Sequence, residues 1–222
     1  RPALIVTVPL IIEKIIRKIV FPKVQDNRVK LLLSMPVVSK KVKDRICQEV
    51  YNAFGGNFYE ISVGGAALSK EVEEFLLGIN FSITVGYGTT ECAPLISYCD
   101  HKEFVAGCCG KPVDRMEVKI LSSDPYHIPG EIVTKGCNVM LGYYKNEEAT
   151  RQAIDEQGWY HTGDLGTMDY EKHLFIRGRI KNMLLGASGQ NIYPEEIEDK
   201  LNSMPMVAES VVVQREDKLV TT

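Results

Sequence analysis

The feature that most constrains this fold is a strand–glycine–helix–strand–glycine succession in the first half of the chain. Residues 59–63 form a β-rich run that ends at Gly64-Gly65, and a second run at 81–85 ends at Gly86-Tyr87-Gly88. Between them Ser69 is placed to cap a helix over 69–77, which has acidic residues in its first turn. This order is typical of a βαβ unit. We therefore predict a parallel sheet with a ligand at the carboxyl ends of its strands.

The N-terminal stretch 4–21 is rich in isoleucine and valine but is interrupted by charged residues. Pro9 suits the first turn of a helix, and the apolar residues that follow fall on one face at helical spacing. We predict an amphipathic helix and no membrane span. Its basic residues leave open a contact with a membrane surface, although packing on a sheet is the favoured interpretation. Two more helices are predicted at 29–35 and 42–54.

The pattern changes after residue 112 to short alternating runs separated by proline and glycine. The runs at 113–121, 130–135 and 174–177 predict a small antiparallel β unit, with a helix over 147–154. In the tail, we expect a helix from Pro194 to residue 201 and a strand over 210–214.

The predicted fold class is therefore α/β: a parallel-sheet layer, a small antiparallel β unit and a truncated α+β C-terminal domain. The expected boundaries are 1–112, 113–178 and 179–222.

Charge and cysteine content exclude several classes of function. The 222 residues carry 26 basic and 29 acidic side chains, a net charge of −3, so no excess of positive charge indicates nucleic-acid binding. The six cysteines include no C-x-x-C pair, which argues against a zinc site or a disulfide framework. We expect reduced thiols in a cytosolic protein. Cys92 could be a catalytic thiol, but a small buried residue beneath a loop is the favoured interpretation.

The densest polar cluster is Gly86-Tyr87-Gly88-Thr89-Thr90-Glu91, directly after a strand. Its glycines let a ligand approach the backbone, its threonine hydroxyls can donate to phosphate, and Glu91 can hold Mg²⁺. A plain turn with a capping threonine is an equal alternative for this segment alone. The turn at 63–69 could admit a flat ring, although it lacks G-x-G-x-x-G spacing and close helix–strand packing explains it as well.

Two further segments combine polar side chains with glycine. Residues 158–166 contain Asp164, which could accept both hydroxyls of a ribose, and His161, for which a structural role is favoured. Residues 177–181 contain three cations that could meet a phosphate or a ribose, or form a solvated linker.

Taken in order, these segments resemble the adenylate-forming acyl-CoA synthetases. The matching motifs are GGAAL, YGTTE, PGEIV-KG, GWYHTGD, RGR-K and SGQNIYPEEIE, and they extend over nearly the whole chain. Residues 8–16 are similar to a segment typical of the long-chain fatty-acid–CoA ligases. The resemblance implies ligation in two steps, with ATP, Mg²⁺ and coenzyme A.

The resemblance also implies roles for individual residues. Gly65 and Ala66 would line the adenine and Tyr87 would stack on it, with Gly86 and Gly88 in the same nucleotide-binding turn. Thr90 would bind the α-phosphate and Glu91 would hold Mg²⁺, so these two are the expected catalytic residues. Asp164 and Arg179 would bind the ribose, Lys181 would be the hinge of the C-terminal domain, and Gly189 would approach pantetheine.

Two expected parts do not occur in this sequence. Nothing before residue 63 resembles the family's phosphate loop, and its catalytic lysine lies beyond residue 222. We therefore expect a fragment of a fatty-acid ligase that does not form an acyl-adenylate alone. The alternatives are a non-catalytic nucleotide-binding module and a lipid-binding protein at a membrane surface. The expected location is the cytoplasm, with peripheral contact at the inner membrane surface left open; the oligomeric state is not predicted.

Overall fold

The structure is a computed structural model that describes residues 2–24, 36–185, 191–202, 204, 206–207, 209–215 and 218–221. The chain forms two compact units. The first comprises Arg1–Gly86 and Cys99–Gly107, and the second comprises Tyr87–Tyr98 and Cys108–Thr222. Parallel and antiparallel sheets together confirm the predicted α/β fold class. The division at residues 112 and 178 stays a prediction.

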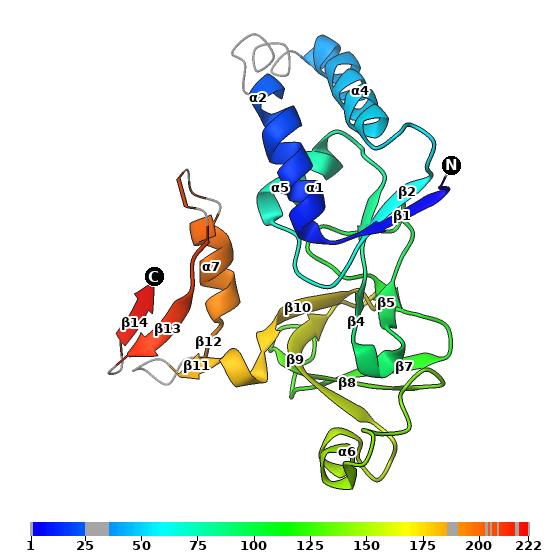
Figure 1. Cartoon of the computed structure of the whole chain (residues 1–222), viewed down its shortest axis with the longest axis vertical. Helices are drawn as coiled ribbons and strands as arrows, with labels where there is room; N and C mark the ends of the chain where they lie inside the picture. The colour runs from blue at the N-terminus through cyan, green and yellow to red at the C-terminus, as the bar shows by residue number, and fades with distance from the viewer. Residues whose placement is uncertain are drawn as a thin grey trace. The chain divides into compact units, whose positions relative to one another are not determined.

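A three-stranded parallel sheet forms the centre of the first unit (Figure 1). Its strands are β1 (Leu4–Thr7), β2 (Glu60–Val63) and β3 (Ile83–Val85), in that order. Helix α5 (Lys70–Gly78) connects β2 to β3, which confirms the predicted βαβ unit. The core side chains Ile61, Val63 and Ile83 are completely buried because this sheet is covered by helices.

Residues Leu4–Thr7, for which the sequence predicted no strand, form β1. Their exposure alternates along the strand, and Leu4 pairs with Glu60 of β2. Helix α1 (Pro9–Ile15) then begins at the expected proline and continues through a π-helical turn (Ile16–Val20) into α2 (Phe21–Val24). The wider turn changes the helical phase, so that Ile19 is 47% exposed. Among the described residues, no helix has both the length and the apolar character that a bilayer span requires.

The start of α5 differs from the prediction in one detail. Ser69 occupies the N-cap position, but its side chain makes no capping hydrogen bond. Its backbone N–H donates instead to Glu13 of α1 at 2.8 Å, and Arg17 forms an ion pair with Glu71 at 2.7 Å. Helix α4 (Pro36–Ala53) confirms the helix predicted at 42–54, whereas the helix predicted at 29–35 lies outside the described residues.

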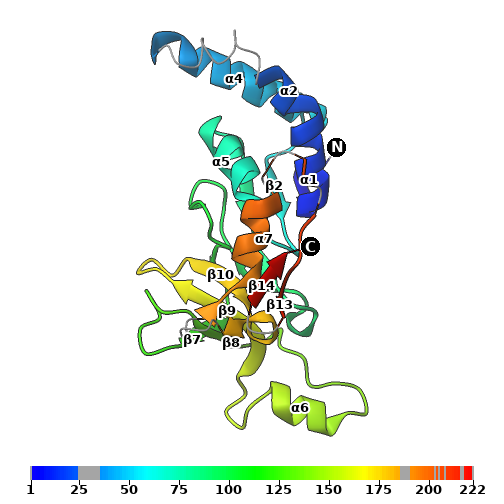
Figure 2. The same ribbon diagram turned by 90° about the vertical axis from the view of Figure 1, so that its left-hand side faces the viewer.

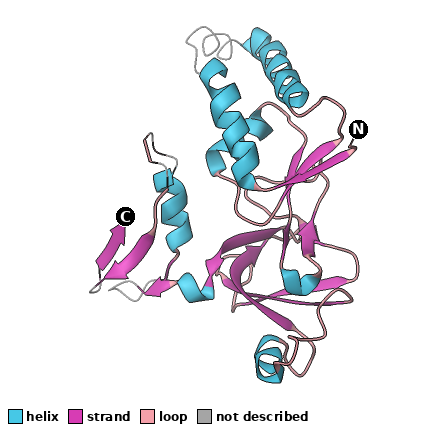
Figure 3. Cartoon of the chain, viewed as in Figure 1, coloured by secondary structure: helices cyan, strands magenta, loops and turns pink. Residues whose placement is uncertain are grey.

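Strands dominate the second unit (Figure 3). A small sheet contains β4 (Tyr87–Gly88), β5 (Leu95–Tyr98) and β6 (Lys111–Pro112). The larger sheet is antiparallel, in the order β10-β9-β8-β7, and confirms the predicted β unit. Its strands are β7 (Met116–Leu121), β8 (Gly130–Gly136), β9 (Tyr160–Met168) and β10 (Leu174–Arg179). Strand β9 was not expected, because its glycines interrupt the alternation of apolar residues.

Two helices accompany these strands. Helix α6 (Glu147–Ala153) lies where a helix was predicted, and Asn146 caps it by accepting from the Ala149 N–H at 3.0 Å. Helix α7 (Pro194–Asn202) opens with the expected proline and contacts β10 and β13 (Figure 2).

The tail also contains short strands. They are β11 (Leu184–Leu185), β12 (Asn191–Ile192), β13 (Val212–Arg215) and β14 (Lys218–Thr221). The strand predicted at 210–214 corresponds to β13.

Candidate functional site

The carboxylate of Asp164 connects three strands of the second unit. Its Oδ2 accepts a hydrogen bond from the Tyr87 hydroxyl of β4 at 2.7 Å, and its Oδ1 forms an ion pair with Arg179 Nε of β10 at 3.0 Å. Asp164 is 4% exposed, whereas the Arg179 side chain is 68% exposed. The structure thus brings together three residues that are far apart in the sequence and that the motifs singled out.

A bulge between β9 and β10 sets this pairing. Ile176 lies opposite Gly166, but Gly178 lies opposite Leu165 and Arg179 opposite Asp164, so one extra residue is accommodated on β10. Directly opposed residues of an antiparallel pair point to the same face. The bulge therefore places the guanidinium of Arg179 on the same face as the Asp164 carboxylate.

Tyr87 is a neutral hydrogen-bond donor in this cluster. Burial of the phenol and the nearby Asp164 carboxylate raise the pKa of Tyr87 well above its usual range. Its ring packs against two apolar clusters, one around Ile96 and the other around Ile132. Tyr87 is therefore fixed at both ends.

Glu91 lies in a short 3₁₀ turn, Thr90–Cys92, directly after β4. Its Oε1 accepts a hydrogen bond from the Tyr143 hydroxyl at 2.9 Å, and its backbone carbonyl accepts from the Met140 N–H at 2.7 Å. Burial alone would raise the pKa of Glu91, but hydrogen bonds from its own backbone and from Tyr143 outweigh burial and lower this pKa. The carboxylate is therefore ionised at neutral pH.

The residues around Glu91 suit a hard cation and phosphate oxygens. An ionised, half-buried carboxylate is the type of ligand that Mg²⁺ prefers. Thr90 is exposed beside it, and its hydroxyl can donate to a phosphate oxygen. The donor set thus fits a magnesium ion bound mainly by water and phosphate, with Glu91 as the protein ligand.

The glycines near these residues are needed for different reasons, lack of space for a side chain at one and a positive φ at another. At Gly88 an added Cβ would lie 1.8 Å from the Pro94 carbonyl oxygen, so the backbone path excludes any side chain. Gly65 has φ +87, and Ala66 next to it is exposed. Gly65, Ala66 and Gly86 belong to the first unit, whereas Tyr87 and Asp164 belong to the second.

Two predicted residues lie in the tail. Lys181 is exposed in a 3₁₀ turn, Ile180–Asn182, directly after β10. Gly189 lies outside the described residues.

His161 and Cys92 have structural environments. The Nδ1 of His161 lies 2.9 Å from Glu131 Oε2, and its Nε2 lies 3.8 Å from Asp155. Cys92 is completely buried, and burial raises the pKa of its thiol, the opposite of what a nucleophilic cysteine needs. None of the six cysteines, all of which lie among the described residues, forms a disulfide. These observations agree with the interpretations favoured from the sequence.

A second polar cluster, in the first unit, was not anticipated. Glu60 of β2 is completely buried, and its Oε2 accepts from the His101 N–H at 2.7 Å and lies 3.0 Å from His101 Nδ1. Asp100 Oδ1 lies 3.3 Å from the same nitrogen. These ligand atoms are close enough together for a metal ion. However, their mutual hydrogen bonds already explain the arrangement, which fastens residues 99–107 to β2. The available signal was an acidic residue inside an apolar β run.

Comparison with known proteins supports one family. The profile of the AMP-binding enzymes matches residues 1–144. A long-chain-fatty-acid–CoA ligase of Mycobacterium bovis is 35% identical over 161 residues, which are 72% of this chain and 26% of that protein. A 4-coumarate–CoA ligase of Narcissus pseudonarcissus is 34% identical over 195 residues, 82% of this chain and 36% of that protein. The chain thus spans about a quarter to a third of the length of these relatives.

A solved structure gives the same result for the fold. The o-succinylbenzoate–CoA synthetase of Bacillus subtilis, in complex with ATP and a magnesium ion, has a TM-score of 0.68 and 31% sequence identity. The similar region covers 78% of this chain and 39% of that one. The relatives found are thus named for three different acids, and the solved one has the architecture described here.

Proposed function

The chain belongs to the AMP-binding enzyme family, and from that premise we propose that its natural protein is a fatty-acid–CoA ligase. The observation that carries the proposal is the cluster of Asp164, Tyr87 and Arg179, in which three strands present a buried carboxylate together with a cation. The proposal assigns the activity to the natural protein, because this chain spans only about a quarter to a third of the length of its relatives.

The reaction has two steps. A fatty-acid carboxylate oxygen attacks the α-phosphorus of ATP, a P–O bond forms, and pyrophosphate leaves with the electron pair of the broken bond. The thiol of coenzyme A, after losing its proton, then attacks the acyl carbon and displaces AMP. In the first step an anion approaches an anion, so the site must neutralise charge.

The residues of this chain would supply binding and orientation. The free lone pairs of the Asp164 carboxylate can accept the ribose hydroxyls, with the exposed Arg179 guanidinium beside them. Thr90 would donate to the α-phosphate. Glu91 would hold Mg²⁺, and when bound this ion neutralises phosphate charge. The remaining proposed roles are adenine contacts for Tyr87, Gly65, Ala66, Gly86 and Gly88, a hinge at Lys181 and a pantetheine contact at Gly189.

The long-chain acid is part of the proposal. It is supported by the segment at residues 8–16 and by similarity to the Mycobacterium bovis ligase. The relatives named for 4-coumarate and o-succinylbenzoate make other acids the natural competitors. Cytoplasmic location, with peripheral contact at the inner membrane surface, belongs to the same proposal, and co-sedimentation with phospholipid vesicles tests that contact.

Fatty-acid-dependent ATP–pyrophosphate exchange by the natural gene product tests the ligase assignment. Acids from short to very long chains, together with 4-coumarate and o-succinylbenzoate, are compared. We expect the exchange rate to peak at long chains and to collapse in Glu91→Ala, because Mg²⁺ loses its protein ligand. Glu148→Ala, an exposed acid on α6, is the matched control and should retain the rate.

Each alternative gives a different result in this assay. A peak at an aromatic acid would keep the ligase and replace its substrate. No exchange with any acid, while ATP still binds, would indicate a non-catalytic nucleotide-binding module.

A further inference from the structure

We propose that Tyr143 is a positioning residue that orients the Glu91 carboxylate toward a divalent cation. This inference rests on the proposed function, because it takes Glu91 as the residue that holds the ion. Tyr143 lies outside the segments from which the nucleotide site was predicted.

Two contacts join the segment before α6 to Glu91. The Tyr143 hydroxyl donates to Glu91 Oε1 at 2.9 Å, although the two residues are 52 positions apart. Three residues before Tyr143, the Met140 N–H donates to the Glu91 carbonyl oxygen at 2.7 Å. The first contact fixes the carboxylate and the second fixes the backbone that carries it.

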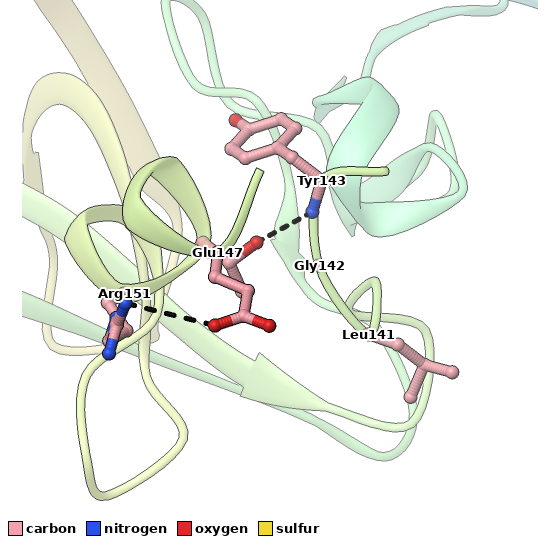
Figure 4. Close-up of a pocket in the computed structure, with 6 residues that line it drawn as sticks. Leu141, Gly142, Tyr143, Glu147 and Arg151 are labelled. Carbon is pink, nitrogen blue, oxygen red and sulfur yellow. Dashed lines mark hydrogen bonds and ion pairs between the residues drawn. The ribbon is translucent and has the colours of Figure 1, made fainter. Parts of the chain in front are cut away.

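Helix α6 in turn fixes Tyr143. The Tyr143 N–H donates to Thr150 Oγ1 at 2.9 Å, and the Thr150 hydroxyl donates to the Asn146 carbonyl oxygen at 2.8 Å. Figure 4 shows the hydrogen bond from the backbone nitrogen of Tyr143 as a dashed line, with the aromatic ring taking no part in it. The backbone of Tyr143 is thus held by α6, and its side-chain hydroxyl reaches Glu91.

The approach of this segment to α6 depends on Gly142. Its φ is +151, and an added Cβ would lie 2.7 Å from Thr150 Cγ2 and 2.9 Å from Thr150 Oγ1. A side chain at this position would push Tyr143 away from the helix. Gly142, Tyr143 and Thr150 therefore together determine where the Tyr143 hydroxyl lies.

The chemistry of the contact favours an orienting role. A phenol donates one hydrogen bond to one carboxylate oxygen, which restrains rotation of the group. The side chains of Tyr160 and Thr89 also hydrogen-bond to Glu91, so Tyr143 is one of the groups that orient this carboxylate. Hydrogen bonds of this kind to metal-binding carboxylates typically change metal affinity by about 10–100-fold when removed. Tyr143 is 38% exposed, so the Tyr143→Phe substitution removes the hydroxyl from a partly solvated position.

Calorimetric titration of the natural gene product with ATP, in the absence of any acid, tests the proposal. The readout is the Mg²⁺ effect, defined as the Kd for ATP in EDTA divided by the Kd for ATP in excess Mg²⁺. Tyr143→Phe should lower this effect about 10-fold and leave the Kd in EDTA unchanged. Tyr144→Phe, at the neighbouring 87% exposed tyrosine, is the matched control and should match the wild type. Thr150→Val should lower the effect in the same direction by less, since it frees the Tyr143 backbone but keeps the hydroxyl.

The outcomes separate this inference from the proposed function. A wild-type protein without any Mg²⁺ effect would contradict the role of Glu91 and with it the proposed function. A wild-type Mg²⁺ effect that Tyr143→Phe leaves intact would overturn the positioning role alone. A lower thermal midpoint of Tyr143→Phe with an unchanged Mg²⁺ effect would assign Tyr143 to stability only and would also overturn it.

Discussion

Asp164 and Tyr87 are single residues whose stability and binding roles can be separated. The Tyr87 hydroxyl is part-buried and its hydrogen-bond acceptor is Asp164, so Asp164→Ala removes the acceptor of that hydroxyl. We expect Asp164→Ala to lower the free energy of unfolding by about 1–3 kcal/mol, the cost of an unsatisfied buried group. Urea unfolding at pH 7 measures this change.

The Tyr87→Phe variant is the control for that measurement. In the double variant Asp164→Ala with Tyr87→Phe no hydroxyl is left without its acceptor, so the two costs should combine to less than their sum. Additive costs would show that the hydrogen bond does not account for the loss of stability.

Residue types were easier to predict than residue contacts. The order of motifs identified Asp164, Tyr87 and Arg179, and in the structure Asp164 contacts both of the others. Tyr143 could not be found in this way. Its partner Glu91 is 52 residues distant, and only the fold of the segment before α6 brings the two together.

At the scale of secondary-structure elements, the turn between β9 and β10 is held by one carboxylate. Asp169 Oδ1 accepts from the backbone N–H groups of Glu171 and His173, and its Oδ2 lies 2.8 Å from His173 Nδ1. Burial acts to raise the pKa of Asp169, but the hydrogen bonds from His173 outweigh burial and lower it. The ionised form is therefore the one that stabilises this hairpin.

This lowered pKa predicts a pH dependence of stability. The contribution of Asp169 is complete above the unfolded-state pKa of about 3.9 and is lost as the pH falls through the lower folded-state value. We expect wild type to be more stable than Asp169→Asn at pH 6, with the difference shrinking toward pH 3. Urea midpoints across this range measure the difference. Glu171→Gln controls for the loss of one charge in the same turn, and a difference independent of pH would contradict the prediction.

The elements that the sequence pattern missed share a physical cause. Residues 4–7 alternate in exposure only because β2 pairs with them, a long-range contact that the isoleucine-rich stretch does not reveal. Strand β9 contains Gly163 and Gly166, and Gly166 is required because an added Cβ would lie 2.7 Å from the Phe175 carbonyl oxygen. Helices with proline or glycine at their ends, such as α4, α5 and α7, were predicted because those signals are local.

At the scale of the whole molecule, strand β1 presents an apolar edge. Among the described residues, β1 pairs with β2 alone, and Val6 is 74% exposed. Leu10 and Ile11, shortly after it, are also more than half exposed. Unpaired strand edges with apolar side chains favour association between chains.

We therefore expect the 222-residue chain to self-associate at high concentration, and Val6→Lys to reduce that association. Sedimentation velocity over a concentration series measures it. Tyr170→Lys, which places the same charge on a 78% exposed tyrosine of the β9–β10 turn, should leave association unchanged. Equal effects of both substitutions would attribute association to net charge and not to the edge of β1.

The bulge on β10 accommodates one residue, Arg177, that has no partner on β9. Deleting Arg177 would restore regular pairing from Ile176 onward and leave Gly178 opposite Leu165 and Arg179 opposite Asp164. The facing of Asp164 and Arg179 would therefore survive, whereas inserting a residue between Gly178 and Arg179 would turn Arg179 to the other face. When related sequences are aligned, a one-residue gap at position 177 is therefore compatible with the cluster, and a one-residue insertion after Gly178 is not.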